Sequence, residues 1–354
     1  MDERWHVRAV PVPGRGEPVD WWVADGRLRA EPVPGARELP GRWVAPGLVD
    51  AHAHLTFDAR GRLGLPGGSA ELIAAQLALH RDAGVLAVRD AGSLPHVPVP
   101  DGAGTGVRVL GCGPFLAPPD FFIAALYEGT PASAAVEAAR ARARSGTRWV
   151  KVVVDYPGPD GNPLAPRLGY PLELVAAIAD AVHEEGGRVA AHVMGCVVRE
   201  LVDAGVDSIE HGNWADEATV RAMATRGTAW TPTLTTVLGH LDPIVNRLPT
   251  ARELLDLQRR TLPLAAELGV TLLAGTDEEP HGSVAAEVAA LVRFGVPAAA
   301  AIAAATTGAR RFLGLPGPEP GAPADLVTFD RNPTGDIAAL GAPVAVLAEG
   351  RRVR

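Results

Sequence analysis

Short apolar runs alternate with longer amphipathic stretches through most of the chain, from about residue 46 to about residue 314. The apolar runs have the length and composition of buried strands. We predict eight strands, at residues 47–54, 85–89, 107–110, 149–154, 188–192, 208–211, 228–233 and 271–276. Strands that alternate with helices are typical of parallel α/β folds, so the pattern predicts a (β/α)8 TIM barrel over residues 46–314.

The stretches between these strands are rich in alanine and have helical periodicity. The clearest helices are predicted at residues 69–82, 131–145, 171–185 and 250–268. Several of them end near a glycine, the residue that most readily closes a helix.

The two ends of the chain have a different pattern. Residues 1–45 and 315–354 contain short β-like pieces broken by glycine and proline. Two unrelated tails would leave these apolar pieces unpaired. We therefore predict one small β-sandwich-like domain assembled from both termini.

Composition narrows the function classes. The chain has 354 residues, 47% of them hydrophobic, and a formal net charge of −8 with scattered lysine and arginine. This distribution argues against a nucleic-acid partner. The partner that we expect is a small-molecule substrate. No run of 18 apolar residues and no secretory leader is recognisable, so we expect no membrane partner and a cytoplasmic location. Composition leaves open whether the chain forms a homo-oligomer.

Histidines and one aspartate are found where predicted strands end. His52 and His54 are two residues apart in one strand, so both side chains point to the same face and can share a cation. His192, His211 and Asp277 end or follow three later strands. The carboxyl ends of barrel strands form the active-site face, so the five side chains are predicted to converge there as metal ligands.

Lys151 is found inside the apolar strand at 149–154. A buried ammonium without a partner is costly, and desolvation lowers its pKa. A neutral amine can react with carbon dioxide, and the resulting carbamate can bridge two metal ions. The alternatives are a lysine that snorkels to the barrel mouth or one that pairs with Asp155.

These motifs and their order resemble the amidohydrolase superfamily, in its imidazolonepropionase-like and prolidase-like binuclear branch. The resemblance covers essentially the whole chain and rests on Lys151, His192 and four motifs: APGLVDAHAH at 45–54, VRDAG at 88–92, SIEHG at 208–212 and GTD at 275–277.

The resemblance implies two divalent metal ions, with zinc (Zn²⁺) as the usual occupant. It implies that His52, His54 and Asp277 hold one ion, that His192 and His211 hold the other, and that a carboxylated Lys151 bridges them. Paired cations lower the pKa of a bridging water and polarise a carbonyl. Asp277 is then the expected catalytic base, the alternative being that it acts as a ligand only.

Several other residues are assigned by position. His281 and Trp214 are predicted to contact substrate, although a surface histidine and a packing tryptophan are the simpler alternatives. Arg89 and Asp90 are interpreted as an ion pair near the barrel rim. Residues 114–127, with Phe115, Phe121, Phe122 and Tyr127, are predicted to form an apolar pocket wall or lid.

The expected activity is hydrolysis of an amide-type C–N bond in a dipeptide, an N-acyl amino acid or a cyclic amide. A lactone or other ester is an alternative substrate, because the same nucleophile attacks both. A mononuclear deaminase of the same superfamily and a silent scaffold are the rival functions. The presence of Lys151 and the alanine and valine that flank His192 favour the hydrolase.

Overall fold

The segments predicted as strands form two parallel sheets. The computed structural model describes residues 3–14, 16–58, 60–146, 148–159, 161–241, 248–277 and 281–354. One sheet has the order β6 (Leu48–Ala53), β7 (Val85–Asp90) and β8 (Arg108–Gly111). The second has the order β14 (Ala229–Thr231), β13 (Ser208–His211), β12 (Arg188–Val193) and β9 (Trp149–Val153). Neighbouring strands in both sheets are parallel, as the sequence predicts.

Backbone contacts connect the two sheets at both of their edges. Leu116, which follows β8, forms a parallel bridge with β9, and Leu272 forms one with β14. The same segment also contacts β6, because the N–H of Ala51 donates to the carbonyl of Ala274 at 2.8 Å. The result is a curled, TIM-barrel-like α/β fold.

The eighth predicted strand, at 271–276, is not a regular strand. Its backbone N–H groups bind to different partners, because Ala274 donates to the carbonyl of Ala304 at 2.9 Å and Thr276 donates to the Asp50 carboxylate at 3.1 Å. Since the hydrogen bonds go in several directions, the segment forms only a bridge at Leu272 instead of a ladder.

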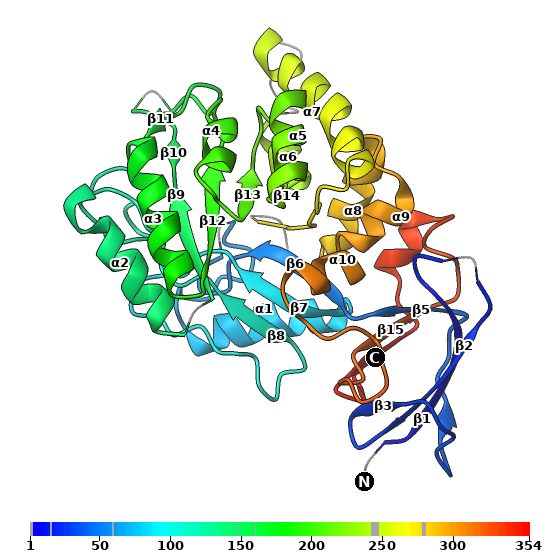
Figure 1. Cartoon of the computed structure of the whole chain (residues 1–354). Coiled ribbons are helices and arrows are strands. Elements are labelled where there is room, and N and C mark those ends of the chain that lie inside the picture. The colour runs from blue at the N-terminus through cyan, green and yellow to red at the C-terminus, as the bar shows by residue number, and fades with distance from the viewer. Residues whose placement is uncertain are drawn as a thin grey trace.

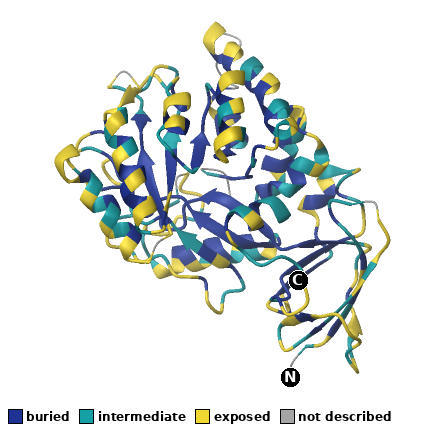
Figure 2. Cartoon of the chain, viewed as in Figure 1, coloured by how far each residue is buried: buried dark blue, intermediate teal, exposed yellow. Residues whose placement is uncertain are grey.

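Helices cover the outer faces of the parallel sheets (Figure 1). The helical elements that follow the strands are α1 (Ala70–Asp82), α2 (Ala132–Arg144), α3 (Leu172–Glu184), α4 (Val198–Asp203), α5 (Glu217–Arg226), α6 (Leu234–Leu241), α7 (Pro249–Glu267), α8 (Val284–Arg293), α9 (Ala298–Ala303) and α10 (Thr307–Phe312). The four helices predicted most clearly are confirmed as α1, α2, α3 and α7. Figure 2 shows buried strands inside and mostly exposed outer faces on these helices.

The capping chemistry that the sequence suggests is present at several helix ends. The Ser69 side chain accepts the N–H of Leu72 at the start of α1, and Pro249 begins α7 without needing a backbone donor. Gly227 ends α5 with a φ of 75°. Within the described ranges, every helix falls short of the length and apolarity needed to cross a membrane.

Both ends of the chain contribute to one eight-stranded sheet, seen at the lower right of Figure 1. Its strands are β1 (Trp5–Pro11), β2 (Val19–Ala24), β3 (Arg27–Arg29), β4 (Arg37–Glu38), β5 (Trp43–Pro46), β15 (Leu326–Phe329), β16 (Ala345–Ala348) and β17 (Arg351–Arg352). The N-terminal strand β5 pairs antiparallel with the C-terminal strand β15. Trp5, Val23, Leu326 and Leu347 share one hydrophobic cluster, so strands from the two termini have a common core. We propose that this unit is a domain formed by residues 1–45 and 315–354, separate from residues 46–314.

Two smaller elements complete the described structure. The strands β10 (Asp155–Tyr156) and β11 (Arg167–Leu168) form a short antiparallel pair beyond the end of β9. The 3₁₀ helix η1 (Ile337–Gly341) packs near α8. The β10–β11 pair is a sheet of its own, and it matters for function because Tyr156 of β10 lines the pocket described next.

Candidate metal centre and its pocket

Three of the predicted ligands lie together at the carboxyl ends of their segments. One possible ligand atom from each of His52, His54 and Asp277 lies within 4.8 Å of the other two. The Nε2 atoms of His52 and His54 lie 3.5 Å and 3.3 Å from Oδ1 of Asp277. All three side chains are at least largely buried, so the group could bind a cation with little competition from bulk water.

The other ring nitrogen of each histidine is already engaged. Nδ1 of His52 lies 2.7 Å from a carboxylate oxygen of Glu210, and Nδ1 of His54 lies 2.9 Å from the carbonyl oxygen of Gly92. A histidine that donates its Nδ1 hydrogen presents an Nε2 lone pair, which is the arrangement found in metal sites. Both rings are therefore held with their free nitrogen toward Asp277.

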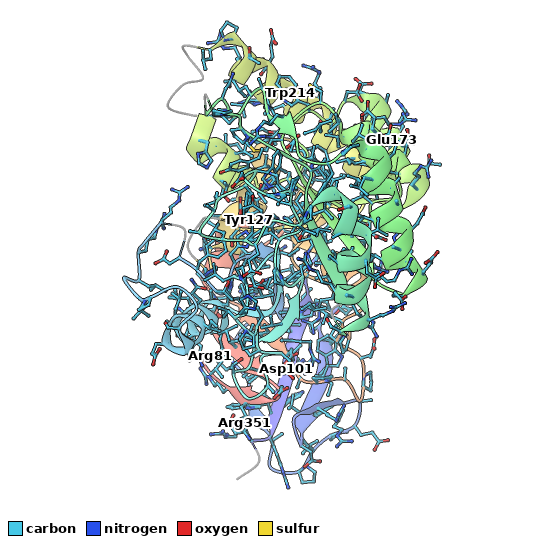
Figure 3. All side chains as sticks on the ribbon, turned by 90° about the vertical axis from the view of Figure 1, so that its left-hand side faces the viewer. Arg81, Asp101, Tyr127, Glu173, Trp214 and Arg351 are labelled. Carbon is cyan, nitrogen blue, oxygen red and sulfur yellow. The ribbon has the colours of Figure 1, made fainter. Side chains whose placement is uncertain are left out.

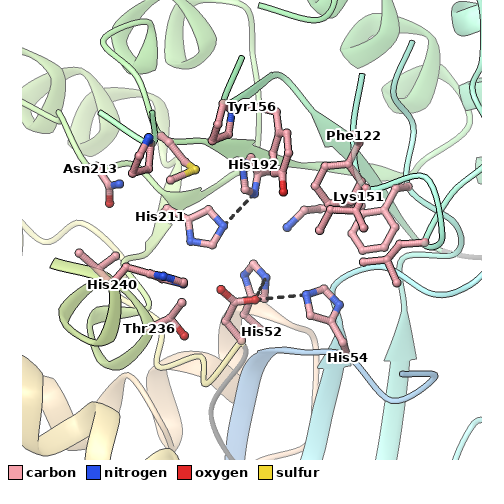
Figure 4. Close-up of a pocket in the computed structure, with 18 of the residues that line it drawn as sticks. His52, His54, Phe122, Lys151, Tyr156, His192, His211, Asn213, Thr236 and His240 are labelled. Carbon is pink, nitrogen blue, oxygen red and sulfur yellow. Dashed lines mark hydrogen bonds and ion pairs between the residues drawn. The ribbon is translucent and has the colours of Figure 1, made fainter. Parts of the chain in front are cut away.

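His192 and His211 form a second group in the same pocket. Nε2 of His211 lies 2.9 Å from Nδ1 of His192, and Nδ1 of His211 lies 2.7 Å from the hydroxyl of Thr233. The ring of His211 is centred 5.2 Å from that of His52. Figure 4 shows the four histidines pointing toward one another across a short gap.

Lys151 projects into the pocket that the histidines line. Its side chain is 1% exposed, and its Nζ has no hydrogen-bond partner among the described residues. Burial lowers the pKa of this amine. The alternative pairing with Asp155 does not occur, because that carboxylate accepts the N–H groups of Met194 and Gly195.

The protonation states suit cation binding. Burial lowers the pKa of His52 to about 4 and that of His211 to about 3, so both imidazoles are neutral near pH 7. Burial acts to raise the pKa of Asp277, but the nearby His52 and His54 hold it well below its usual range. Neutral imidazoles and an ionised carboxylate are the forms that bind divalent metals, so these residues fit the metal centre that the sequence predicts.

Asp50 positions two of these segments and is not singled out by the sequence motifs. Its carboxylate accepts the N–H of His52 at 3.2 Å, the N–H of Thr276 at 3.1 Å and the hydroxyl of Thr276 at 2.6 Å. Asp277 in turn donates its N–H to the carbonyl of His52 at 2.7 Å. The one available signal is spacing, because Asp50 is two residues before His52 in the same strand.

The predicted ion pair between Arg89 and Asp90 is wrong. Arg89 donates to Glu210 at 2.6 Å, and both side chains are fully buried. Asp90 instead accepts the N–H of Leu55 at 2.8 Å. Adjacent residues of a strand point to opposite faces, so Arg89 reaches across the fold while Asp90 does not.

Glu210 is therefore a functional candidate that the sequence motifs did not identify. It accepts from the hydroxyl of Ser208 at 2.5 Å and from Arg89, and it holds the ring of His52. Burial acts to raise the pKa of Glu210, but Arg89 and His52 hold it well below its usual range. The carboxylate thus links the buried Arg89 to His52, one of the candidate metal ligands.

Replacing Glu210 with glutamine is expected to weaken both stability and metal binding. The change leaves the buried Arg89 guanidinium without its counter-charge, which costs about 3–5 kcal/mol. Loss of an outer partner of a ligating histidine lowers metal affinity by roughly 10- to 100-fold. Thermal unfolding and metal titration of the variant test this. The matched control is E200Q, at an exposed site on α4; equal results for the two variants would contradict the role given to Glu210.

His281 and Trp214, the two residues predicted to contact substrate, lie outside the described pocket lining. Nε2 of His281 lies 3.2 Å from the carbonyl oxygen of His54, and its ring is centred 4.8 Å from that of His80. Trp214 is partly buried and packs against the main hydrophobic core. Figure 3 shows it toward the upper end of the molecule, well above Tyr127. A direct role in substrate binding stays a prediction for both.

The metal-binding candidates lie at the base of a pocket of about 470 Å³. One wall comes from residues after β8 and β9, and another comes from α6. The lining includes Phe57, Phe115, Phe122, Ile123, Leu126, Tyr156, Met194, Asn213, Thr236, Val237, His240 and Leu241. The predicted apolar wall from residues 114–127 is present. Phe121 and Tyr127 do not belong to the described lining.

The wall formed by α6 is held from outside by Glu287 of α8. The Glu287 carboxylate accepts the N–H of Leu234 at 2.8 Å and both the N–H and the hydroxyl of Thr235 at 2.9 Å. These donors belong to the first turn of α6, whose N–H groups lack partners inside the helix. Glu287 therefore caps the helix through tertiary contact.

The stability contribution of Glu287 is expected to depend on pH. Burial raises its pKa in the folded protein to about 7, above the ordinary glutamate value of 4.5. Its contribution is therefore fully present below pH 4.5 and is lost as the pH rises toward 7. Relative to E287Q, wild type should lose up to about 3 kcal/mol of unfolding free energy across this range. Denaturant unfolding of both metal-free proteins at several pH values tests this; a difference that does not change with pH would contradict it.

Comparisons with known proteins identify the family of the chain. The profile of the amidohydrolase family matches residues 43–353. An uncharacterized protein of Mycobacterium tuberculosis is 36% identical over 360 residues, which cover 98% of this chain and 95% of the relative.

Solved structures support the same grouping. A candidate prolidase from Bifidobacterium longum superposes with a TM-score of 0.81 at 25% identity, covering 99% of this chain and 94% of the other. The ochratoxinase of Aspergillus niger superposes with a TM-score of 0.79 at 22% identity, covering 100% and 96%, which by itself shows the shared fold. The chain belongs to the amidohydrolase family and resembles its prolidase-like members.

Proposed function

We propose that the chain is a metal-dependent hydrolase that cleaves an amide-type C–N bond. Family membership supports a hydrolase of amide bonds. The observation that carries the metal-dependent part is the meeting of six side chains at one pocket: three buried histidines, the partly buried His192, Asp277, and Lys151, whose amine has no hydrogen-bond partner among the described residues. Such a set has no packing explanation, because six polar side chains would otherwise be desolvated for no gain.

The donor set favours two divalent cations. His52, His54 and Asp277 would hold one, His192 and His211 would hold the other, and Lys151 carrying a carbamate would contribute to both. Zinc suits imidazole and oxygen ligands. When bound, such ions lower the pKa of a water molecule and polarise a substrate carbonyl. We also propose that the two sheets with the bridging segment at Leu272 form one closed barrel, which would fix these six residues on a common rim.

The remaining chemistry falls to Asp277. Its carboxylate is 11% exposed, so it is open to the pocket while it contacts both His52 and His54. One carboxylate oxygen would take a proton from the attacking water. The same oxygen would return that proton to the leaving nitrogen, so one water and one amide give a carboxylic acid and an amine.

Metal analysis combined with activity screening tests the proposal. We expect about two equivalents of metal per chain and hydrolysis of at least one compound in a panel of dipeptides, N-acyl amino acids, lactams and lactones. One equivalent with ammonia release from an amino-substituted ring would instead indicate a deaminase. A protein that binds no metal and cleaves nothing in the panel would be a scaffold, and the proposal would be wrong.

A further inference from the structure

A continuous set of aromatic rings lines one side of the pocket. We call Phe57, Phe115, Phe122 and Tyr156 the aromatic wall. Successive rings in this order are centred 6.3 Å, 5.1 Å and 4.8 Å apart. Rings at these separations form one apolar surface. The aromatic wall is therefore a single feature of the pocket.

The aromatic wall lies against both groups of histidines. The ring of Phe57 stacks on that of His54 at 4.8 Å, and the ring of Phe122 is centred 6.2 Å from that of His192. A substrate bond placed between the histidine groups would have the aromatic wall beside it. Whatever group is attached near that bond would then contact the rings.

The aromatic wall is held in place by its surroundings. A Cβ atom at Gly92 would lie 2.3 Å from the ring of Phe115, so only glycine leaves room for this ring. The hydroxyl of Tyr127 accepts the N–H of Phe122 at 3.0 Å and donates to the carbonyl of Pro118 at 2.8 Å. These contacts fix the loop before any ligand binds, which reduces the entropy lost on binding.

The opposite side of the pocket is formed by α6, with Val237 and Leu241 as apolar contacts. Figure 4 shows Thr236 and His240 across the pocket from Phe122. Apart from the proposed metal ligands, the described lining contains one Asp, Glu, Lys or Arg side chain, and it is the acidic Asp58. Within that lining, a carboxylate on the substrate near the aromatic wall would find no arginine, and no lysine except Lys151.

We propose that the pocket selects substrates with an aromatic group beside the scissile bond and no carboxylate on that group. The aromatic ring of the substrate packs with one face against the aromatic wall, and its other face contacts Val237 and Leu241 of α6. This inference rests on the proposed hydrolase, since it places the scissile bond at the histidines. The proposed selectivity distinguishes the chain from enzymes that recognise a free amino acid through its carboxylate.

Binding to metal-free protein tests the selectivity without requiring hydrolysis. The probes are N-acetylphenylalanine amide, N-acetylalanine amide and N-acetylphenylalanine as the free acid, titrated by ligand-observed NMR. We expect the phenylalanine amide to bind at least about tenfold more tightly than the alanine amide, which corresponds to partial burial of one ring. The free acid should bind more weakly than the phenylalanine amide.

Neighbouring phenylalanines provide a matched pair of variants. F122L removes a ring from the aromatic wall and should reduce the phenylalanine-to-alanine ratio to less than about threefold. F121L changes a buried ring outside the described pocket lining and should leave the ratio unchanged. Equal binding of the two amides, tighter binding of the free acid, no measurable binding or a ratio insensitive to F122L would each overturn the inference.

Hydrolysis of the same compounds by the metal-loaded protein is measured separately. A preserved binding ratio without any turnover would count against the proposed function and support the selectivity. Turnover without a preference for the phenylalanine amide would support the function and overturn the selectivity.

Discussion

Replacing Lys151 with alanine is expected to lower metal content below two equivalents and to reduce hydrolysis by at least about 100-fold. Loss of a ligand should cost at least as much as loss of an outer partner of a ligand, which costs roughly 10- to 100-fold. The physical reason is the position of the amine. Its Nζ is buried in the pocket of the histidines and has no hydrogen-bond partner in the part of the chain that the structure describes, and burial lowers its pKa. Such an amine is available to form a carbamate, and its removal takes away an anionic oxygen donor.

Two further measurements separate a ligand from a structural lysine. Acetate or propionate should partly restore the activity of K151A, because a short carboxylate can occupy the space of the carbamate. K151M should be at least as stable as wild type in the metal-free state, since it replaces an unpaired buried amine with an apolar side chain. Full metal loading and full activity of K151A would remove Lys151 from the metal centre.

The metal-binding candidates could be predicted because their positions follow from local geometry. A two-residue period places His52 and His54 on one face of a strand, and parallel strands end at a common rim. His192, His211 and Asp277 needed only the strand assignments to be brought to that rim. Lys151 was conspicuous because an apolar strand rarely contains an unpaired lysine.

The partners of these ligands could not be predicted, since they depend on contacts across the fold. Glu210 is next to His211 in sequence, yet it supports His52, which is 158 residues away. Arg89 similarly pairs with Glu210, which is 121 residues away, and not with the adjacent Asp90. No local pattern specifies which buried acid meets which buried base when the segments are far apart.

The pocket wall was likewise predictable only in part. The aromatic residues in 114–127 indicate an apolar wall, and this prediction is confirmed for Phe115 and Phe122. Tyr127 instead uses its hydroxyl to hold the loop, and Phe121 packs beneath Arg167, with the guanidinium carbon 4.8 Å from its ring centre. Composition therefore predicts the character of the surface, while the fold of the loop decides which rings line the pocket.

Asp277 provides the sharpest test of how the centre works. Replacing it with asparagine keeps the size of the side chain and the backbone hydrogen bond to His52. We expect the fold to be retained and turnover to fall by about 10²- to 10⁴-fold, the usual contribution of a general acid–base group. The loss should be mainly in kcat, because the walls that bind substrate are unchanged.

The pH profile and metal content distinguish a base from a ligand. In wild type the histidines hold the pKa of Asp277 low, so its basic form persists at acidic pH, while D277N has no such group to titrate. If Asp277 acts as the base in addition to being a ligand, D277N can still bind metal through its amide oxygen, and it should lose turnover at every pH even when it is fully loaded with metal. D101N, at a surface residue visible in Figure 3, is the control and should match wild type. Turnover of D277N within a fewfold of wild type at full metal loading would show that the proton is carried by another group.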